Sequence, residues 1–331
     1  MKTDKIITLE HGAGGEESRA LVGKILLKYF KNDILARLDD AAALRLSSEK
    51  IAFTTDSYVV NPVFFEGGNI GDIALCGTVN DLSVKGAAAK YISLGLIIEE
   101  GFSFGDFERI LKSIAARAKE AGVQIVTGDT KVVERGAADK IFINTSGVGE
   151  IIKEMSTQNI RAGDAVIASG FLGEHGMTVM NARHNLGLKG LRSDVAPLNQ
   201  ITLAVLPYAH MMRDLTRGGL TSSLTEIARS AGYDIEIDAE KIPLGSAVKA
   251  AAALLGSDPL QSANEGKLVC FAPASLAAKV LKIMRAQKYG KNAAVIGRVL
   301  KTKNKKVFIK TSVGARRELK EREGGNLPRL C

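Results

Sequence analysis

The feature that most constrains the fold of this chain is an alternation of strand and helix patterns that runs through the sequence twice. In the first run, residues 51–60, 91–98 and 123–129 are rich in β-branched and apolar residues and predict strands. The clearest helix pattern is 104–122, where apolar residues recur at helical spacing and Gly122 is a stop signal. This alternation predicts an α/β domain.

The first run is extended by further elements, and the pattern then restarts. Residues 16–31 predict an amphipathic helix, 71–87 a helix containing Cys76, and 140–150 a strand. The second run predicts a strand and glycine turn within 161–173, helices within 200–212 and 219–231, a strand at 233–238, a helix near 245–255, a strand at 267–273, a helix at 275–287, and strands at 293–300 and 307–311. We therefore predict two α/β domains, 1–150 and 151–318, followed by a charged, glycine-bearing flexible tail, 319–331.

Composition restricts the class of protein. With 331 residues, 46% of them hydrophobic, the chain can bury a core in two domains. No apolar run approaches the length of a membrane span, and the first ten residues lack the layout of a signal peptide, so we expect a cytoplasmic protein with no membrane partner. The three cysteines and four histidines show no spacing typical of structural zinc or of a disulfide framework.

The formal net charge is +9, and basic residues are concentrated in 301–306 and 315–322. Nucleic-acid binding would account for such charge, but Trp is absent, few aromatic residues stand among these basic residues, and no recognition motif is present. We therefore expect no nucleic-acid partner. The charge indicates a solvated face, or attraction of an anionic cofactor or an acidic partner.

Aspartates recur in one kind of position in the first predicted domain. They stand in LDDAA (38–42), TTDS (54–57), VNDLS (79–83) and TGDTK (127–131), and at least two close an apolar strand. Any one of them could merely cap a helix or a turn. Four together favour a site for a metal and a nucleotide, because Mg²⁺ takes oxygen ligands and bridges to phosphates.

Two glycine-containing loops precede predicted helices. HGAGGEE (11–17) and RDLTRGGLTSS (213–223) could each present backbone amides to a phosphate at a helix N-terminus. Neither loop has the P-loop pattern or the Rossmann spacing. A tight turn into a helix is the alternative for both.

These motifs, with the C-terminal PRLC, resemble the HypE family of hydrogenase maturation factors, the carbamoyl dehydratases of the aminoimidazole ribonucleotide synthetase-related (PurM-like) superfamily. The resemblance spans the chain from His11 to Cys331. The aspartate motifs are typical of the superfamily, and only the terminal cysteine on a Pro-Arg tail is specific to this member. The resemblance implies a two-domain PurM-like fold, in which the mixed sheet of the N-terminal domain forms a homodimer interface with ATP bound nearby.

The resemblance also implies a reaction. Cys331 would accept a carbamoyl group from the carbamoyltransferase HypF, ATP would activate this thiocarboxamide, and loss of water would leave a thiocyanate. The cyano group would pass to iron held by the HypC–HypD complex and become a cyanide ligand of a [NiFe]-hydrogenase. The physical logic agrees, since an amide oxygen leaves only after activation, so dehydration needs ATP, Mg²⁺ and a base. A terminal cysteine can reach both a partner and its own ATP site.

The match to the family motifs assigns roles to particular residues. Cys331 is the carrier, Lys131 would neutralise charge on the transferred phosphoryl group, and Glu265 would take the amide proton if its pKa is raised. A surface turn residue is the alternative for Glu265. The predicted ligands of Mg²⁺ and ATP are Asp40, Asp56, Asp81 and Asp129, and the predicted phosphate-loop positions are Gly14, Gly15, Asp214, Gly218 and Gly219. Cys76 and Cys270 lie in apolar stretches, so we predict that both are inert core residues.

Other functions stay open at this point. Selenophosphate synthetase, thiamine-monophosphate kinase and aminoimidazole ribonucleotide synthetase belong to the same superfamily. Selenophosphate synthetases carry a reactive Cys or Sec beside the N-terminal glycine loop, but no cysteine precedes residue 76 here. A small-molecule kinase or synthetase would have no use for a cysteine at the last position. The non-enzymatic alternative is a scaffold whose basic tail docks an acidic partner.

Overall fold

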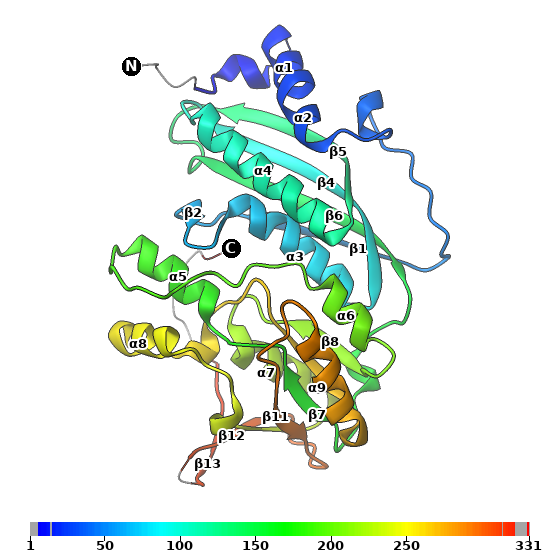
Figure 1. The fold of residues 1–331 in the computed structure, drawn as a ribbon, viewed down its shortest axis with the longest axis vertical. Helices are drawn as coiled ribbons and strands as arrows, with labels where there is room; N and C mark the ends of the chain where they lie inside the picture. Colours follow the sequence, from blue (N-terminus) through cyan, green and yellow to red (C-terminus); the bar gives the residue numbers. More distant parts are fainter. Residues whose placement is uncertain (1–5, 14, 313, 322–329, 331) are drawn as a thin grey trace.

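The structure of the chain is a computed structural model that describes residues 6–13, 15–312, 314–321 and 330. The chain forms two α/β units, which Figure 1 shows one above the other with the N-terminal unit at the top. In the described part of the chain, no helix is both long and apolar enough to span a membrane.

The first unit is a four-stranded sheet with helices on one face. Its strands, in the order of the sheet, are β1 (Ile51–Tyr58), β6 (Ile141–Ile151), β4 (Ala87–Glu99) and β5 (Gln124–Val133). Only β4 and β5 pair in parallel, so the sheet is mixed, as predicted. Helices α3 (Ile70–Val84) and α4 (Phe104–Ala121) pack over this sheet (Figure 1).

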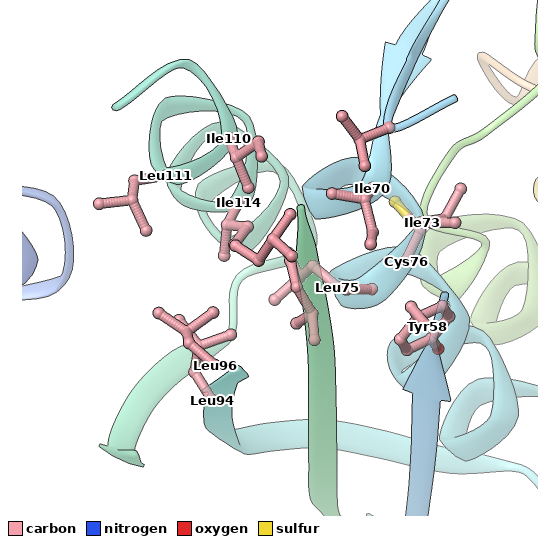
Figure 2. Close-up of a cluster of buried hydrophobic side chains, with 14 of the residues drawn as sticks. Tyr58, Ile70, Ile73, Leu75, Cys76, Leu94, Leu96, Ile110, Leu111 and Ile114 are labelled. Atoms are coloured by element: carbon pink, nitrogen blue, oxygen red, sulfur yellow. The ribbon is translucent and has the colours of Figure 1, made fainter. Parts of the chain in front are cut away.

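The two helices have different amino-acid patterns because they have different surroundings. Every residue of α3 except Asp81 is buried, since α3 lies between the first sheet and the second unit. Helix α4 is amphipathic, begins at Ser103, whose Oγ accepts hydrogen bonds from the next turn, and ends at Gly122 with a φ of +71°. The predicted helix 104–122 is confirmed. Figure 2 shows Ile110 and Ile114 of α4 close to the apolar side chains of α3.

The opposite face of the first sheet carries exposed apolar side chains. Phe53 on β1 is 68% exposed, and Ile51 and Ile97 are also exposed. Because side chains alternate across a strand, Phe53 points away from the α3 side, to which Thr54, Asp56 and Tyr58 contribute. We call this surface the open face of the first sheet.

The N-terminal segment adds a helix beside β5. Elements α1 (Glu16–Ala20), η2 (Leu21–Leu26) and α2 (Leu27–Phe30) run on continuously, with η2 wound as a π-helix, so the predicted helix 16–31 is confirmed. The short elements of this unit are η1 (Leu9–Gly12), η3 (Leu35–Arg37), β2 (Phe64–Phe65) and β3 (Gly68–Asn69).

The second unit is a seven-stranded sheet with helices on both faces. Its strands, in the order of the sheet, are β13 (Arg316–Glu318), β12 (Val307–Lys310), β9 (Ile235–Asp238), β11 (Ala294–Val299), β7 (Ala165–Ala168), β10 (Leu268–Ala272) and β8 (Met211–Asp214). Its helices are α5 (Glu174–Arg183), α6 (Asn199–Val205), α7 (Gly219–Ala231), α8 (Ser246–Leu255) and α9 (Ala277–Ala286), with short turns η4 (Thr157–Asn159), η5 (Ala239–Lys241), η6 (Pro259–Gln261) and η7 (Ala274–Leu276). On β10, Val269 and Phe271 pack in the core with α7, whereas Cys270 packs in the core with α6 and α9.

The second unit and the start of the predicted tail differ from the sequence prediction in four places. The predicted helix within 200–212 ends at Val205, because Met211–Asp214 pairs with β10 as the edge strand β8. Helix α5 and strand β13 were not predicted. Leu319, at the start of the predicted tail, is buried and its N–H donates to the Val307 carbonyl. Most of the tail, 322–329 and 331, lies outside the described residues.

The buried stripe of α4 gives a test of the fold. Phe107 is fully buried, so Phe107→Ala should lower the free energy of unfolding by about 3–5 kcal/mol. Leu254→Ala is the control, because this side chain is 62% exposed on α8 and its loss should change stability by about 0.5 kcal/mol or less. Urea denaturation of both variants measures the difference, and equal effects would contradict this packing.

Candidate active site

The structure gathers the predicted site residues at two places. Asp56, Asp81, Asp214 and Glu265 interact electrostatically with one another, and we call these four residues the acidic cluster. Three motifs from the N-terminal part of the chain line a separate cavity beside β5. Cys331 and Gly14 lie outside the described residues.

Asp56 and Asp81 form the side of the acidic cluster contributed by the first unit. Asp56 points toward α3 from β1, and Asp81 is the one residue of α3 that is not buried. The Thr54 hydroxyl donates to Asp81 at 2.9 Å, and the Tyr58 hydroxyl donates to Asp56 at 3.4 Å. The negative charge of Asp81 opposes ionisation of Asp56, so a cation beside the two carboxyl groups is electrostatically favoured.

Asp214 and Glu265 form the other side of the cluster. Asp214 ends the edge strand β8, and Glu265 precedes β10 in the same sheet. The Glu265 side chain is enclosed, with the residue 2% exposed, and its Oε1 has no hydrogen-bond partner among the described residues. The alternative of a surface turn residue is therefore wrong for Glu265.

Burial and mutual repulsion raise the pKa values across the cluster. Burial, followed by the charge of Asp81, raises the pKa of Asp56 to about 6 and the pKa of Asp214 to about 7. Burial raises the pKa of Glu265 well above its usual range, and the neighbouring Asp194 and Asp214 contribute. The cluster therefore retains protons near neutral pH when no cation is bound.

Asn80 joins the two units beside Glu265. Its side-chain amide donates to the carbonyl oxygens of Ala196 (3.1 Å) and Glu265 (3.3 Å), and its Oδ1 accepts from the Leu198 N–H at 2.7 Å. The side chain thus satisfies three backbone groups of the second unit from a helix of the first. Asn80 was not predicted as a site residue. The signal in the sequence is an amide side chain within an apolar helix, because such a side chain, when buried, needs hydrogen-bond partners.

The backbone around Glu265 has little space for change. The Glu265 N–H donates to Asp194 Oδ1 at 3.0 Å, and Asp194 also lies 3.3 Å from Lys267 Nζ. A Cβ atom on Gly266 would stand 1.9 Å from the Asp194 carbonyl oxygen, so only glycine fits this position. Asp194 and Lys267 were not predicted, because their partners are distant in the sequence.

The second place is a cavity of about 310 Å³ at the edge of the first sheet. Its lining joins the three motifs HGAGG, LDDAA and TGDTK through Gly12, Asp39, Ala41 and the segment 127–131, and apolar side chains of the N-terminal helix complete it. An apolar cavity with a polar rim suits a nucleoside. Asp40 lies between two of the lining residues and is exposed.

Asp129 and Lys131 stand on the rim of this cavity. Both side chains are exposed, and the Lys131 ammonium lies 3.1 Å from the Asp129 carboxylate. Asp129 pairs with Gly95 and Gly95 with Asn144, whereas Asp56 pairs with Thr145, so Asp129 and Asp56 belong to opposite faces of the sheet. Within the described residues of one chain, no group of three or more His, Cys, Asp or Glu side chains is arranged to hold a metal.

The two predicted phosphate loops differ in geometry. Gly218 and Gly219 have positive φ values (+76° and +58°), and a Cβ on Gly219 would stand 2.5 Å from the Ser262 carbonyl oxygen. The charge of Arg217 lowers the pKa of Asp56, so this loop lies beside the acidic cluster. In the N-terminal loop, Gly15 has open space around it, whereas a Cβ on Gly12 would stand 2.5 Å from the Val132 nitrogen.

The predicted core role of the two internal cysteines is confirmed. Cys76 and Cys270 are both fully buried. Burial raises the pKa of the Cys270 thiol to about 12 and that of Cys76 well above its usual value, so neither forms a thiolate readily.

Comparison with known proteins defines the class. The N-terminal domain of AIR synthase-related proteins matches residues 38–151, and the C-terminal domain of the same family matches residues 161–310. The chain therefore belongs to the AIR synthase-related family. This confirms the predicted two-domain fold.

Within this family the chain belongs to the HypE carbamoyl dehydratases, as predicted. It is 42% identical to the carbamoyl dehydratase HypE of Escherichia coli, covering 98% of this chain and 99% of that protein. It is 44% identical to the HypE of Rhodobacter capsulatus, covering 99% of both. The relatives span nearly the whole chain, so the match includes both units.

Solved structures agree. A HypE crystallised in complex with ATP superposes with a TM-score of 0.94 at 42% identity, covering 98% of this chain and 99% of that one. A HypE–HypF complex matches with a TM-score of 0.80 at 44% identity, covering 92% and 100%. The thiamine-monophosphate kinase of Stenotrophomonas maltophilia matches with a TM-score of 0.68 at 19% identity, covering 93% and 98%, which shows a shared fold alone.

The raised pKa values predict a pH dependence of stability. An acid that keeps its proton when folded but loses it when unfolded makes stability fall as pH rises between the two pKa values. For Asp214 this window runs from about pH 4 to about pH 7. Without nucleotide or Mg²⁺, Asp214→Asn should therefore show a flatter decline of melting temperature across this window than the wild type.

The matched control is Glu226→Gln, which changes an exposed carboxylate paired with Arg213. Its melting curves should follow the wild-type pH dependence. Identical slopes for wild type and Asp214→Asn would contradict a retained proton on Asp214.

Proposed function

We propose that this chain uses ATP to dehydrate a carbamoyl group on the Cys331 sulfur to a thiocyanate, which supplies cyanide for [NiFe]-hydrogenase maturation. The observation that carries the proposal is the enclosed Glu265 carboxyl, whose Oε1 is unpartnered among the described residues beside two aspartates of the first unit. A buried carboxyl group with a raised pKa is suited to proton transfer.

The proposed reaction has three steps. The Cys331 sulfur forms a bond to the carbamoyl carbon of the donor supplied by HypF, the bond from that carbon to its leaving group breaks, and the thiol proton is released. The amide oxygen of this carbamoyl group then takes the γ-phosphoryl group of ATP, with release of ADP and of one N–H proton. Loss of phosphate with the second N–H proton leaves a carbon–nitrogen triple bond on sulfur. Once the cation that accompanies ATP has displaced its retained proton, the Glu265 carboxylate is the proposed acceptor of an amide proton, since an environment that disfavours the charged form makes the carboxylate a stronger base.

Asp56 and Asp81 fit a Mg²⁺ ion that ATP brings with it. The mutual repulsion of the two carboxyl groups favours a cation beside them, and Mg²⁺ is commonly held by one or two carboxylates together with phosphates. When bound, the ion would neutralise phosphate charge. Arg217, Gly218 and Gly219 stand beside this pair and present a guanidinium group and a helix N-terminus to a phosphate.

Asp40, Asp129 and Lys131 complete the proposed ATP site from the cavity side, together with the glycine loop. Because Asp129 and Asp56 belong to opposite faces of the sheet within one chain, the proposed site combines the cavity of one chain with the acidic cluster of a second chain. We propose a homodimer in which two copies pair through the open face of the first sheet, where Phe53 is exposed, with ATP near this interface.

The proposed partners follow from the chemistry of the tail. HypF is the proposed carbamoyl donor, supported by the solved HypE–HypF complex of a relative. An iron scaffold of the HypC–HypD type is the proposed acceptor of the cyano group. Both exchanges require Cys331 to reach a partner protein, whereas dehydration requires it to reach the ATP site of this protein.

The direct test is the mass of the tail peptide. Incubation with HypF, carbamoyl phosphate, ATP and Mg²⁺ should add the mass of cyanide in place of hydrogen on the peptide that ends in Cys331. Glu265→Gln should still be carbamoylated, but should convert at least about 100-fold more slowly, because a general base typically contributes that much. Glu226→Gln, an exposed glutamate, is the control.

Two results would contradict this function. One is consumption of ATP with an unmodified tail, which would favour a small-molecule enzyme of the superfamily. The other is full conversion in Glu265→Gln, which would remove this residue from the chemistry.

The proposed dimer is tested by a charge on the open face. Phe53→Asp should sediment as a monomer at concentrations where the wild type is a dimer, because an unpaired carboxylate would be buried in the interface. Leu254→Asp, at a similarly exposed apolar position on α8, should remain a dimer. A wild-type monomer, or a dimeric Phe53→Asp, would refute this interface.

A further inference from the structure

His175 connects the end of the chain to the second unit. It is the second residue of α5 and is fully buried. Its Nε2 lies 2.9 Å from the carbonyl oxygen of Leu330, the residue before Cys331, and its Nδ1 lies 2.8 Å from the Ser193 hydroxyl. Both ring nitrogens are therefore engaged, one with the tail and one with the body of the protein.

The surroundings fix which nitrogen carries the proton. A carbonyl oxygen can only accept, so Nε2 must donate to Leu330. The Ser193 hydroxyl can then donate to Nδ1, while its oxygen accepts from the Val195 N–H at 3.2 Å. Burial lowers the pKa of His175, which favours this neutral form. The imidazole is thus held in one tautomer and in one orientation.

The side chain of Leu330 also has a place. It packs against the apolar core of the first unit, and its Cδ1 would stand 3.3 Å from a Cβ built on Gly176. Phe65 holds the other side of the His175 ring in an edge-on contact, with ring centroids 5.2 Å apart. The contact with Leu330 therefore consists of one hydrogen bond to its backbone carbonyl and the packing of its apolar side chain.

Two adjacent residues, Ser193 and Asp194, connect His175 with the acidic cluster. Ser193 contacts the imidazole, and the next residue, Asp194, accepts a hydrogen bond from the Glu265 N–H. Asp194 also acts electrostatically on both His175 and Glu265. Leu330 is therefore held beside the part of the second unit that contacts Glu265.

We propose that His175 is a positioning residue, which holds the Leu330 carbonyl and thereby presents the terminal cysteine to Glu265 during dehydration. The inference rests on the proposed function but concerns a separate step, the docking of the tail. One hydrogen bond and one leucine side chain form a contact that can be released, as a carrier that also visits partner proteins requires. His175 itself touches no reacting atom.

The experiment separates loading from conversion. Full-length protein is carbamoylated by HypF and purified, Mg²⁺-ATP is added, and intact mass follows conversion in a single turnover. His175→Ala should be carbamoylated at the wild-type rate but converted about tenfold more slowly, the factor expected for one lost hydrogen bond. His175→Gln, which keeps a donor, should recover part of the rate. His184→Ala removes an exposed imidazole at the end of the same helix and should behave as wild type.

A second readout does not depend on the chemistry. Alkylation of Cys331 by iodoacetamide without ATP should be slower in the wild type than in His175→Ala. Leu330→Ala, a change in the tail that leaves both units intact, should raise the alkylation rate in the same way, which keeps the test valid if His175→Ala fails to fold.

The outcomes distinguish the two proposals. Conversion in the wild type and in His175→Ala at equal rates would overturn the positioning role and leave the proposed function standing. Absence of conversion in the wild type would overturn the proposed function, and the alkylation rates would then decide alone whether His175 docks the tail. Equal alkylation of wild type, His175→Ala and Leu330→Ala would overturn the docking.

Discussion

The burial of Glu265 against Asn80 is the interaction on which the arrangement of the site depends. The Asn80 amide comes from a helix of the first unit and binds three backbone groups of the second, including the Glu265 carbonyl. Leaving those groups unpaired in the interior would cost about 1–3 kcal/mol each, so the two units are held in one relative position. That position encloses the Glu265 carboxyl and places two aspartates of the first unit beside it.

The enclosure has a cost for the folded chain. Two of the four carboxyl groups, those of Asp214 and Glu265, are buried, and the buried ammonium group of Lys267 is paired with Asp194. A protein gains nothing in stability from such a cluster without a cation. The arrangement makes sense as preparation for Mg²⁺-ATP, since a cation would replace the retained protons. The acidic cluster and the cavity beside β5 are two parts of one proposed site, and the open face of the first sheet is the surface through which a second chain would join them.

Much of the fold could be predicted from local patterns. The helix at 104–122 has a complete apolar stripe and a glycine stop, and the aspartates of TTDS and NDLS belong to the pair that the structure brings together. The edge strand β8 was missed because Met211 and Met212 continue an apolar helical pattern, and only pairing with β10 makes them a strand. Asn80, His175 and Asp194 were missed for a related reason. Asn80 and Asp194 both contact Glu265, and His175 contacts Leu330; these contacts join residues 71 to 185 positions apart, which no local pattern specifies.

The central claim is that the two units enclose the Glu265 carboxyl group in surroundings that raise its pKa well above its usual range, so that it favours the protonated form until substrate arrives. Infrared difference spectra of wild type against Glu265→Gln, recorded near neutral pH without nucleotide or Mg²⁺, test this directly. The account predicts a carbonyl stretch of a protonated carboxyl group in the wild type that is missing in the variant. A difference spectrum that contains only carboxylate bands would show that Glu265 is already ionised, and would contradict the account.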